Sequence, residues 1–545
     1  MATRKDQLDA FNFARRRMVA NLVVPTATGS DEGAPRPVKT FATSIILSAL
    51  AVVAVMVLGV FKPSAPNGWQ NGLAVDSSTG AAYITQSGEL HAVYNITSAR
   101  LILGTNFSKY DVPDSTLNNS GVTIGSPVGI LGAPEDVPSS SNMGLTQWSF
   151  CQNEVLANGA STSTGQNYLE VGYAPSSSTT VWTSKSAAAL IVHDNADDVY
   201  LIDGDYRYFI GNDTTQKTYV QDILGAVNEG TAMTSDTTGF WVSDAWLNVF
   251  TKGDPLTYPK LSDLGDGVTA SSQPGNTVGE YGALKTSSSA GGAVQTANGV
   301  LQLTPFEYDL YTANGDLTTK HINPFPSNTL NLSAINAANK GGAPQASTTF
   351  ESSTDGSNWP VLPPSLYGTD TSSATTANIC VGYNGQSENN VPALTTWTSS
   401  ALPSGADNGS FGVPQSGGNL LAGVVLVKPG YGLIAKSSSG TEYLIEDSGF
   451  RYPLGSGVVA VAGATASASA SASASGSGNS SCASNSSSGS GSSSSSSSGQ
   501  TVTAVCQLGY SQVKPETLPP TWINLLQGGA ELNPAAAGKS PQSGS

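Results

Sequence analysis

Residue types that carry out catalysis are sparse in this chain and stand apart from one another. Its three histidines, His91, His193 and His321, occupy unrelated local sequences. No Cys/His or Asp/Glu cluster has the spacing of metal ligands. Asp203 and Asp205 form a pair of carboxylates, but such residues are common in turns. These patterns predict no catalytic residue and no metal site.

A lysine near the C-terminus invites comparison with a nucleotide-binding loop. Gly538-Lys539-Ser540 matches the end of the P-loop pattern, in which backbone amides wrap the phosphates. That pattern requires a further glycine five residues before Gly538, where this chain has Asn533. We therefore predict no cofactor. An extracytoplasmic ATPase or other hydrolase is kept as an alternative function.

The elements that would position any site begin with an apolar run, Phe41 to Phe61, which contains no charged residue. As a helix this run would be about 30 Å long, close to the thickness of one bilayer core. The residues before it include seven basic and four acidic side chains. Because basic residues favour the cytoplasmic side, we predict a single uncleaved transmembrane helix in the plasma membrane, with the N-terminus cytoplasmic and most of the chain extracytoplasmic.

The part beyond this run is acidic but poor in charge. From Phe61 onward 16 basic and 35 acidic residues remain, a net charge of −19. That balance argues against nucleic acid as a partner. With 60 glycines and only 11% charged residues in the chain, the composition predicts a mainly β fold with short helices (α+β), divided into several domains.

A helical stripe precedes the apolar run. Leu8, Phe11, Ala14, Met18 and Leu22 recur at the spacing of one helix face. We predict an amphipathic helix that docks on a partner, or on the inner membrane surface, through Phe11, Met18 and Leu22. A solvated juxtamembrane helix explains the pattern equally well.

All four cysteines, Cys151, Cys380, Cys482 and Cys506, follow the apolar run. An even number in an exported region is typical of disulfides. Three pairings are possible. Cys482 and Cys506 are the nearest pair, which would leave Cys151 and Cys380 to pair across more than 200 residues. Free buried thiols are the alternative.

Internal repetition is the main signal in the exported part. Three segments place aromatic and β-branched residues on both sides of a glycine-containing turn, as a hairpin requires. Tyr83, Tyr200 and Tyr443 lie near their starts, and His91 is aligned with Arg207 and Arg451 of the other copies. The three segments, and the two halves of a weaker fourth copy, are residues 82–94, 199–208 and 442–452, and 299–303 with 308–311.

A second repeat is sharper. Trp246 and Trp522 are each followed by Asn at +2, Gly at +7 and Leu at +10. This spacing predicts a short amphipathic helix that ends at a glycine cap, Gly253 or Gly529. The last copy is longer, and residues 463–499 account for the difference. They are nearly all Ala, Ser and Gly, a composition that cannot build a core and predicts a disordered loop.

Taken together, the order of these elements and several local motifs resemble a known family. It is the EccB family, the single-span membrane component of the type VII (ESX) secretion system of actinobacteria. The motifs that carry the resemblance, in chain order, are Phe13-Ala14-Arg15-Arg16-Arg17-Met18-Val19-Ala20, residues 29–37, Phe61-Lys62-Pro63, residues 94–102, residues 129–134, Trp148-Ser149-Phe150-Cys151, Leu508-Gly509-Tyr510 and residues 532–537.

The resemblance implies an elongated extracytoplasmic region of β-rich repeats around a central β domain, with a disulfide in that core carried by Cys151 and Cys380. It implies a structural and assembly role in a complex that exports WXG-type proteins. The implied partners are an FtsK/SpoIIIE-type ATPase, a multi-span channel-like subunit, a further membrane subunit, copies of the chain itself and the lipid bilayer. Some family members carry an ATPase or ATP-binding label, which the residues above do not support.

The expected division of the chain follows from the repeats and the resemblance. It comprises 1–40 as a cytoplasmic segment, 41–61 as the membrane helix, 62–135 as the first repeat, 136–185 with 326–416 as the central core, 186–265 as the second repeat, 266–325 as the third, 417–535 as the last, and 536–545 as a disordered tail. A cell-wall binding module is another alternative, in which Tyr83, Tyr200, Tyr206 and Tyr443 would contact glycans.

Overall fold

The structure is a computed structural model that falls into two compact units. The residues that it describes are 3–23, 37–60, 65–105, 107–119, 121–154, 166–173, 180–183, 189–228, 233, 239–284, 291–326, 330–345, 349–350, 358–361, 364, 366–367, 377–388, 391–399, 413–415, 418, 420–459 and 500–541. Cys482 and the predicted loop 463–499 lie outside these ranges.

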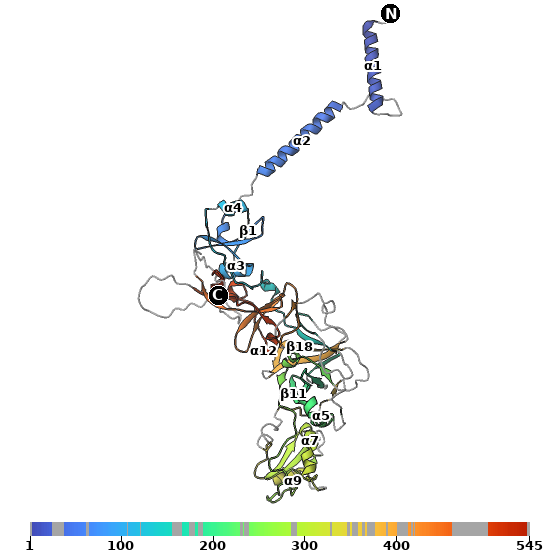
Figure 1. The fold of residues 1–545 in the computed structure, drawn as a ribbon, viewed down its shortest axis with the longest axis vertical. Helices are drawn as coiled ribbons and strands as arrows, with labels where there is room; N and C mark the ends of the chain where they lie inside the picture. Colours follow the sequence, from blue (N-terminus) through green and yellow to red (C-terminus); the bar gives the residue numbers. More distant parts are fainter. Residues whose placement is uncertain are drawn as a thin grey trace, which may run out of the picture. The chain divides into compact units, whose positions relative to one another are not determined.

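Unit 1 comprises Met1–Asn67 and Asp111–Ser120. It is helical, with α1 (Arg4–Val23), α2 (Pro37–Val60) and α4 (Asp114–Asn119) (Figure 1). Helix α2 begins four residues before the predicted run, at a proline, which is well suited to a first helical turn because its missing N–H has no partner there. Among the residues that the structure describes, none of the helices has both the length and the apolar character that crossing a membrane requires.

Unit 2 comprises Gly68–Tyr110 and Gly121–Ser545 and is a mixed α+β region of β-sheets and short helices. Its first sheet contains an antiparallel meander with a short parallel strand beside β3. The elements are η2 (Trp69–Asn71), β1 (Leu73–Asp76), β2 (Ala82–Gln86), β3 (Glu89–Ala92), α3 (Ile96–Leu103) and β5 (Thr123–Ile124), while β4 (Lys109–Val112) spans the boundary between the units.

The second and the last repeat share one sheet topology. Each has a three-stranded antiparallel meander with a two-residue parallel strand on either side, in the orders β12-β9-β10-β11-β13 and β27-β22-β23-β24-β28. The hairpin glycines Gly204 and Gly449 have φ values of 58° and 77°, a region that residues with a Cβ rarely adopt.

The elements of the second repeat are β9 (Ala189–His193), β10 (Asp198–Asp203), β11 (Tyr206–Asn212), α5 (Asp213–Val227), β12 (Phe240–Trp241), α6 (Asp244–Asn248) and β13 (Thr251–Lys252). Those of the last repeat are β22 (Gly432–Lys436), β23 (Glu442–Glu446), β24 (Phe450–Pro453), β25 (Ser456–Val459), β26 (Gln500–Thr503), α11 (Ala504–Gln507), β27 (Glu516–Thr517), α12 (Pro520–Ile523), β28 (Gln527–Gly528) and α13 (Pro534–Ala537).

The third sheet corrects the predicted fourth hairpin. Its strands are β14 (Tyr281–Ala283), β15 (Gly292–Thr296) and β16 (Gly299–Leu303), so residues 299–303 pair with 292–296 and not with 308–311. The latter lie in α7 (Pro305–Thr312), where Thr304 and Glu307 form a capping box that starts the helix. Two further helices, α8 (Gly315–Thr319) and α9 (Leu332–Ala338), follow.

The central sheet has seven strands in the order β20-β21-β7-β6-β18-β19-β8. Its strands are β6 (Trp148–Glu154), β7 (Asn167–Val171), β8 (Thr180–Thr183), β18 (Ala377–Glu388), β19 (Val391–Ser399), β20 (Val413–Pro414) and β21 (Val424–Val427), and the short η3 (Ser140–Asn142) precedes them. One face carries Trp148, Phe150 and Leu169 into the largest core. Cys151 directly follows Phe150, and Cys380 lies between Ile379 and Val381 of the same core, so both cysteines are on the opposite face of the sheet.

Strand pairing moves three of the predicted boundaries. Strand β21, expected in the last repeat, pairs with β7 of the central sheet. Strand β17 (Leu366–Tyr367), expected in the central core, pairs with β9 of the second repeat. Helix α9, also expected in the core, packs its Ile335 and Ala338 with Ala293 and Val300 of the third sheet.

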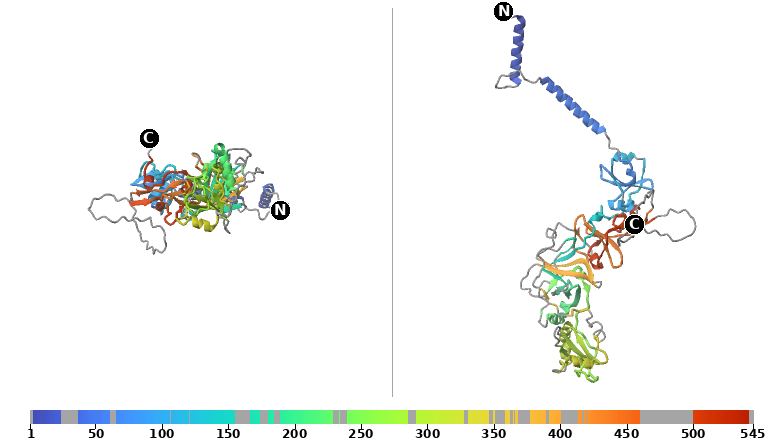
Figure 2. Two further views of the ribbon diagram at one scale, coloured as in Figure 1. Left: turned by 90° about the horizontal axis from the view of Figure 1, so that it is seen from below. Right: turned by 180° about the vertical axis from the view of Figure 1, so that it is seen from behind.

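The predicted disordered tail is wrong for residues 536–541, because they are ordered. Helix α13 buries Ala537 completely, and the Lys539 carbonyl accepts a hydrogen bond from the Gly129 amide. The C-terminal segment therefore lies beside the first sheet of unit 2 (Figure 2). Residues 542–545 lie outside the described part of the chain.

Candidate functional site

The two tryptophan motifs meet in one core. Trp246 on α6 and Trp522 on α12 are both fully buried, and the cluster around them joins the second repeat, the central sheet and the last repeat. Trp522 packs edge to face on Trp148 of β6 at a centroid distance of 6.3 Å, and it lies 5.7 Å from the ring of Tyr383 on β18. Segments far apart in sequence are thus held together by shared apolar burial.

The glycines of these motifs are needed for close packing and not for helix capping, which corrects the prediction. The C-cap residues are Val249 after α6 and Asn524 after α12, each in ordinary right-handed geometry. A Cβ on Gly253 would lie 2.5 Å from Cδ1 of Tyr208, and a Cβ on Gly529 would lie 2.5 Å from Cδ1 of Tyr452. Each glycine lets an aromatic ring pack closely against the backbone.

The backbone contacts at the two glycines are also equivalent. The Gly253 amide donates to the Arg207 carbonyl at 2.9 Å, and the Gly529 amide donates to the Arg451 carbonyl at 2.8 Å. The leucines at +10, Leu256 and Leu532, are both fully buried. The two copies therefore share both hydrogen bonding and packing.

The first repeat contains the same contact with a histidine. A Cβ on Gly125 would lie 2.6 Å from Nδ1 of His91, and the Gly125 amide donates to the Leu90 carbonyl. His91 is therefore equivalent to Tyr208 and Tyr452. The predicted alignment of His91 with the two arginines was wrong by one residue, because hairpin register depends on partner strands.

The three repeat tyrosines occupy one register position. Tyr83, Tyr200 and Tyr443 face Ala92, Phe209 and Pro453 across their hairpins. All three are half-buried. The Tyr200 ring packs on Phe209, the Tyr443 ring lies below the Arg451 guanidinium, and Tyr206 stacks on Tyr208.

The three cysteines that the structure describes lie in the central sheet and in the last repeat. Cys151 and Cys380 are opposite one another on β6 and β18 and form a disulfide, the pair that the family resemblance implied. Cys506, on α11, is also disulfide-bonded, while Cys482 lies outside the described residues.

The predicted docking residues lie on α1 of unit 1. Phe11, Met18 and Leu22 are 64%, 71% and 87% exposed. Phe13, on another face of the same helix, is 68% exposed. The apolar side chains of α1 are thus available for contacts with other molecules.

The lysine motif has the wrong context for a phosphate loop. Gly538-Lys539-Ser540 follows helix α13, whereas a P-loop precedes the helix whose N-terminus holds the phosphates. Within the described residues, no group of three or more His, Cys, Asp or Glu side chains could hold a metal ion.

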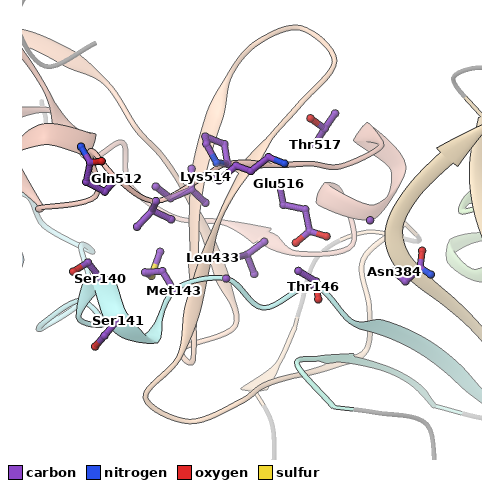
Figure 3. A pocket seen from close by; sticks show the side chains of 15 residues that line it. Ser140, Ser141, Met143, Thr146, Asn384, Leu433, Gln512, Lys514, Glu516 and Thr517 are labelled. Carbon is purple, nitrogen blue, oxygen red and sulfur yellow. The ribbon is translucent and has the colours of Figure 1, made fainter. Parts of the chain in front are cut away.

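The structure contains one feature that the sequence analysis missed, a cavity of about 720 Å³ at the edge of the last repeat (Figure 3). Its wall comes from four parts of the chain. They are the segment from Ser140 to Thr146, the turn at Asn384 and Gly385, strand β22, and the segment from Gln512 to Thr517.

Glu516 is the acidic residue of this wall. Figure 3 shows its carboxylate beside Leu433 and Thr146. Both oxygens are enclosed and accept no hydrogen bond from any residue that the structure describes. Burial raises the pKa of this carboxyl to about 7. A Cβ on Gly385 would lie 2.5 Å from Oε1, so the glycine lies directly over the carboxylate.

A tyrosine borders the same carboxylate. The Tyr383 hydroxyl donates to the Thr517 carbonyl at 3.3 Å. Burial, and to a lesser degree the charge of Glu516, raise the pKa of Tyr383 to about 12. The edge of this core therefore has an acidic group with little access to solvent.

The second repeat has a phenylalanine at the position that Glu516 occupies in the last repeat. Glu516 stands six residues before Trp522, and Phe240 stands six residues before Trp246. Both begin the parallel edge strand, opposite Ala435 and Val192 respectively. Phe240 fills its place in the core, so aligning the two tryptophan motifs would have revealed Glu516 as an exception.

The fold is that of a β-rich repeat protein, and comparison with known proteins shows which family it belongs to. The family described as "Type VII secretion system ESX-1, transport TM domain B" matches residues 1–541. The chain therefore belongs to this family, known as EccB.

The relatives agree with this assignment. The chain is 33% identical over 159 residues to "ESX-1 secretion system ATPase EccB1" of Mycobacterium tuberculosis, which is 29% of this chain and 32% of that protein. It is 29% identical over 150 residues to "ESX-3 secretion system ATPase EccB3" of the same species, 27% of each chain. The matched stretches thus span about a third or less of these curated relatives.

Solved structures share the fold over more of the chain. A chain of "an intact ESX-5 inner membrane complex" superposes with a TM-score of 0.55 at 16% identity, covering 98% of this chain and 95% of that one. The "EccB3 dimer from the ESX-3 core complex" gives a TM-score of 0.57 at 18% identity, covering 86% of this chain and 100% of that one.

Proposed function

We propose that this chain is a structural and assembly subunit of a type VII (ESX) secretion complex that exports WXG-type proteins. The observation that carries the proposal is the family match over residues 1–541. The fold supports it, because two repeats and the central sheet share one core and would present fixed surfaces to neighbouring subunits. We also propose the division into terminal segments, repeats and a central domain, with the boundaries adjusted to the strand pairing.

The proposed location is the plasma membrane, with a cytoplasmic N-terminus and one membrane span at α2. The support is the uncharged run from Phe41 to Phe61 and the exposure of apolar side chains such as Ile45, Leu47 and Val55 along the helix. The excess of basic residues before the run supports the orientation.

The proposed partners are an FtsK/SpoIIIE-type ATPase, a multi-span subunit, a further membrane subunit and other copies of this chain. We propose that α1 docks on the cytoplasmic part of the assembly. Its exposed residues Phe11, Met18 and Leu22 would be buried there. Burying one such side chain stabilises a contact by about 1.5–3 kcal/mol.

The test is isolation of the tagged chain from its own membrane in mild detergent, followed by native gel electrophoresis and mass spectrometry. We expect a large complex that contains an FtsK-type ATPase. A monomer or homodimer that persists across several detergents would refute the proposal. Replacing Phe11, Met18 and Leu22 by Ser should release the chain from the complex, whereas Phe13→Ser, a change of similar exposure on another face, should not.

The word ATPase in the names of the relatives favours a second candidate, nucleotide hydrolysis by the chain itself. Phosphate release by the purified full chain would test it, with Lys539→Ala as the matched variant. Release that disappears in this variant would support hydrolysis. Equal release by both proteins would point to a contaminant or to a site elsewhere.

A further inference from the structure

The cavity beside Glu516 lies where one repeat departs from the other. In the second repeat, Phe240 packs into the core between its sheet and the central sheet. In the last repeat, the same position carries Glu516, whose side chain borders about 720 Å³ of open space instead. A buried carboxylate without hydrogen bonds is costly, so its presence in an otherwise apolar position calls for a partner.

We propose that this cavity binds the cationic end of a lysine or arginine side chain on an extended loop of a partner protein, with Glu516 as the anchor. The cation would form a charge-assisted hydrogen bond with the carboxylate. This inference goes beyond the assembly role proposed above and does not depend on it.

The lining matches such a side chain. Met143, Leu433 and Val513 offer apolar surface for a methylene stem, and Asn384 and Gln512 offer amides for the backbone of a peptide. Glu516 is the one carboxylate in the wall, whereas divalent cations in proteins take several oxygen ligands. An organic cation therefore fits better than a metal ion.

The carboxylate can turn toward the cavity without losing a hydrogen bond to any described residue. Its oxygens lie under Gly385, where they accept no hydrogen bond from the described residues. Rotation about the side-chain torsions of Glu516 would carry them into the open space and break no hydrogen bond. Lys514, two residues earlier, also lines the cavity, but its side chain is exposed, and it gives no hydrogen bond to Glu516 in the described part of the chain. Burial alone is the cause of the raised pKa of Glu516, so the charge of Lys514 does not offset that of the carboxylate.

The experiment is isothermal titration calorimetry on the purified full chain at about pH 8, where the carboxylate ionises. The probes are the N-acetylated, C-amidated tripeptides Gly-Arg-Gly and Gly-Gln-Gly, and methylguanidinium alone. We expect binding of the arginine tripeptide only. Glu516→Gln should weaken it at least about tenfold, the loss expected for a hydrogen bond to a charged group.

Three further variants sharpen the test. Glu516→Phe, which installs the residue of the second repeat, should remove the anionic anchor and abolish binding. Glu531→Gln removes an exposed carboxylate of the same repeat outside the cavity and should leave binding unchanged. Lys514→Gln removes a positive charge from the wall of the cavity, which repels a bound cation, and should therefore strengthen binding. Thermal melts of each variant check that the chain is folded.

Several outcomes would overturn the proposal. They are no binding by the wild-type chain, equal binding of both tripeptides, and unchanged binding in folded Glu516→Gln. Methylguanidinium that binds as tightly as the arginine tripeptide would show a site for a free small cation and overturn the protein partner. A chain that assembles but does not bind refutes this proposal alone, and one that binds but does not assemble refutes only the proposed function.

Discussion

Gly529→Ala should destabilise the edge of the last repeat. The new Cβ would lie 2.5 Å from Cδ1 and 3.1 Å from Cζ of Tyr452, whereas carbon atoms prefer about 3.5–4.0 Å. Tyr452 is buried, so the strand or the ring must move by roughly 1 Å. Overpacking of this kind costs about 1–3 kcal/mol. Strand movement would also weaken the hydrogen bond from Gly529 to the Arg451 carbonyl, worth about 1 kcal/mol.

The assay must report on this region, since a chain with several cores need not unfold in one step. Amide hydrogen exchange of residue 529 and Leu532 measures local opening. Both amides donate to β24, and we expect faster exchange in the variant. Gly528→Ala is the matched control, because a Cβ on Gly528 has no described atom within 4 Å.

A double-mutant cycle tests the cause. In a Tyr452→Leu background the ring is gone, so adding Gly529→Ala should cost at least about 1 kcal/mol less than in the wild type. Equal costs in both backgrounds, or equal effects of Gly528→Ala and Gly529→Ala, would show that the ring contact is not the reason for the glycine.

Three other predictions concern the cores. Trp522→Ala should destabilise the core by about 3–5 kcal/mol, measured by chemical unfolding, because the side chain is fully buried; a change below about 1 kcal/mol would contradict the shared core. Burial raises the pKa of Glu170 from 4.5 to about 8, so the folded chain holds a proton that the unfolded chain releases. As the pH rises from 4.5 to about 8, the free energy of unfolding should therefore fall by up to about 1.4 kcal/mol per pH unit. Glu170→Gln should flatten that dependence in melts across pH, and a slope unchanged by the variant would refute the assignment. Cys151→Ser with Cys380→Ser should lower the free energy of unfolding by about 2–5 kcal/mol, and reductant should then have no further effect on this core.

Local patterns in the sequence were sufficient for several features. The hairpins around Tyr200 and Tyr443 were visible because alternating apolar residues on both sides of a glycine turn determine local pairing. The two tryptophan motifs were visible because the same residue types, which pack in the same way, recur at the same spacing. The family could be named from the order of short motifs, and the match over residues 1–541 confirms it.

Other features depended on residues distant in sequence. The two-residue parallel strands have no periodicity to detect, so the roles of Gly253 and Gly529 emerged only when Tyr208 and Tyr452 were seen to lie on them. His91 was misaligned by one residue for the same reason. Strand β21 was assigned to the wrong sheet because its partner, β7, is distant in the sequence.

The sequence by itself determined the local elements, the repeats and the family, because these depend on neighbouring residues and their spacing. The spacing of the cysteines left three pairings open, and the tertiary structure placed Cys151 opposite Cys380, as the family resemblance implied. Only the tertiary structure showed why the motif glycines are needed. It also decided that Glu516 lies dehydrated beside an open cavity. Burial and the close approach of side chains depend on segments that meet only when the chain folds, and no local pattern encodes the distance between them.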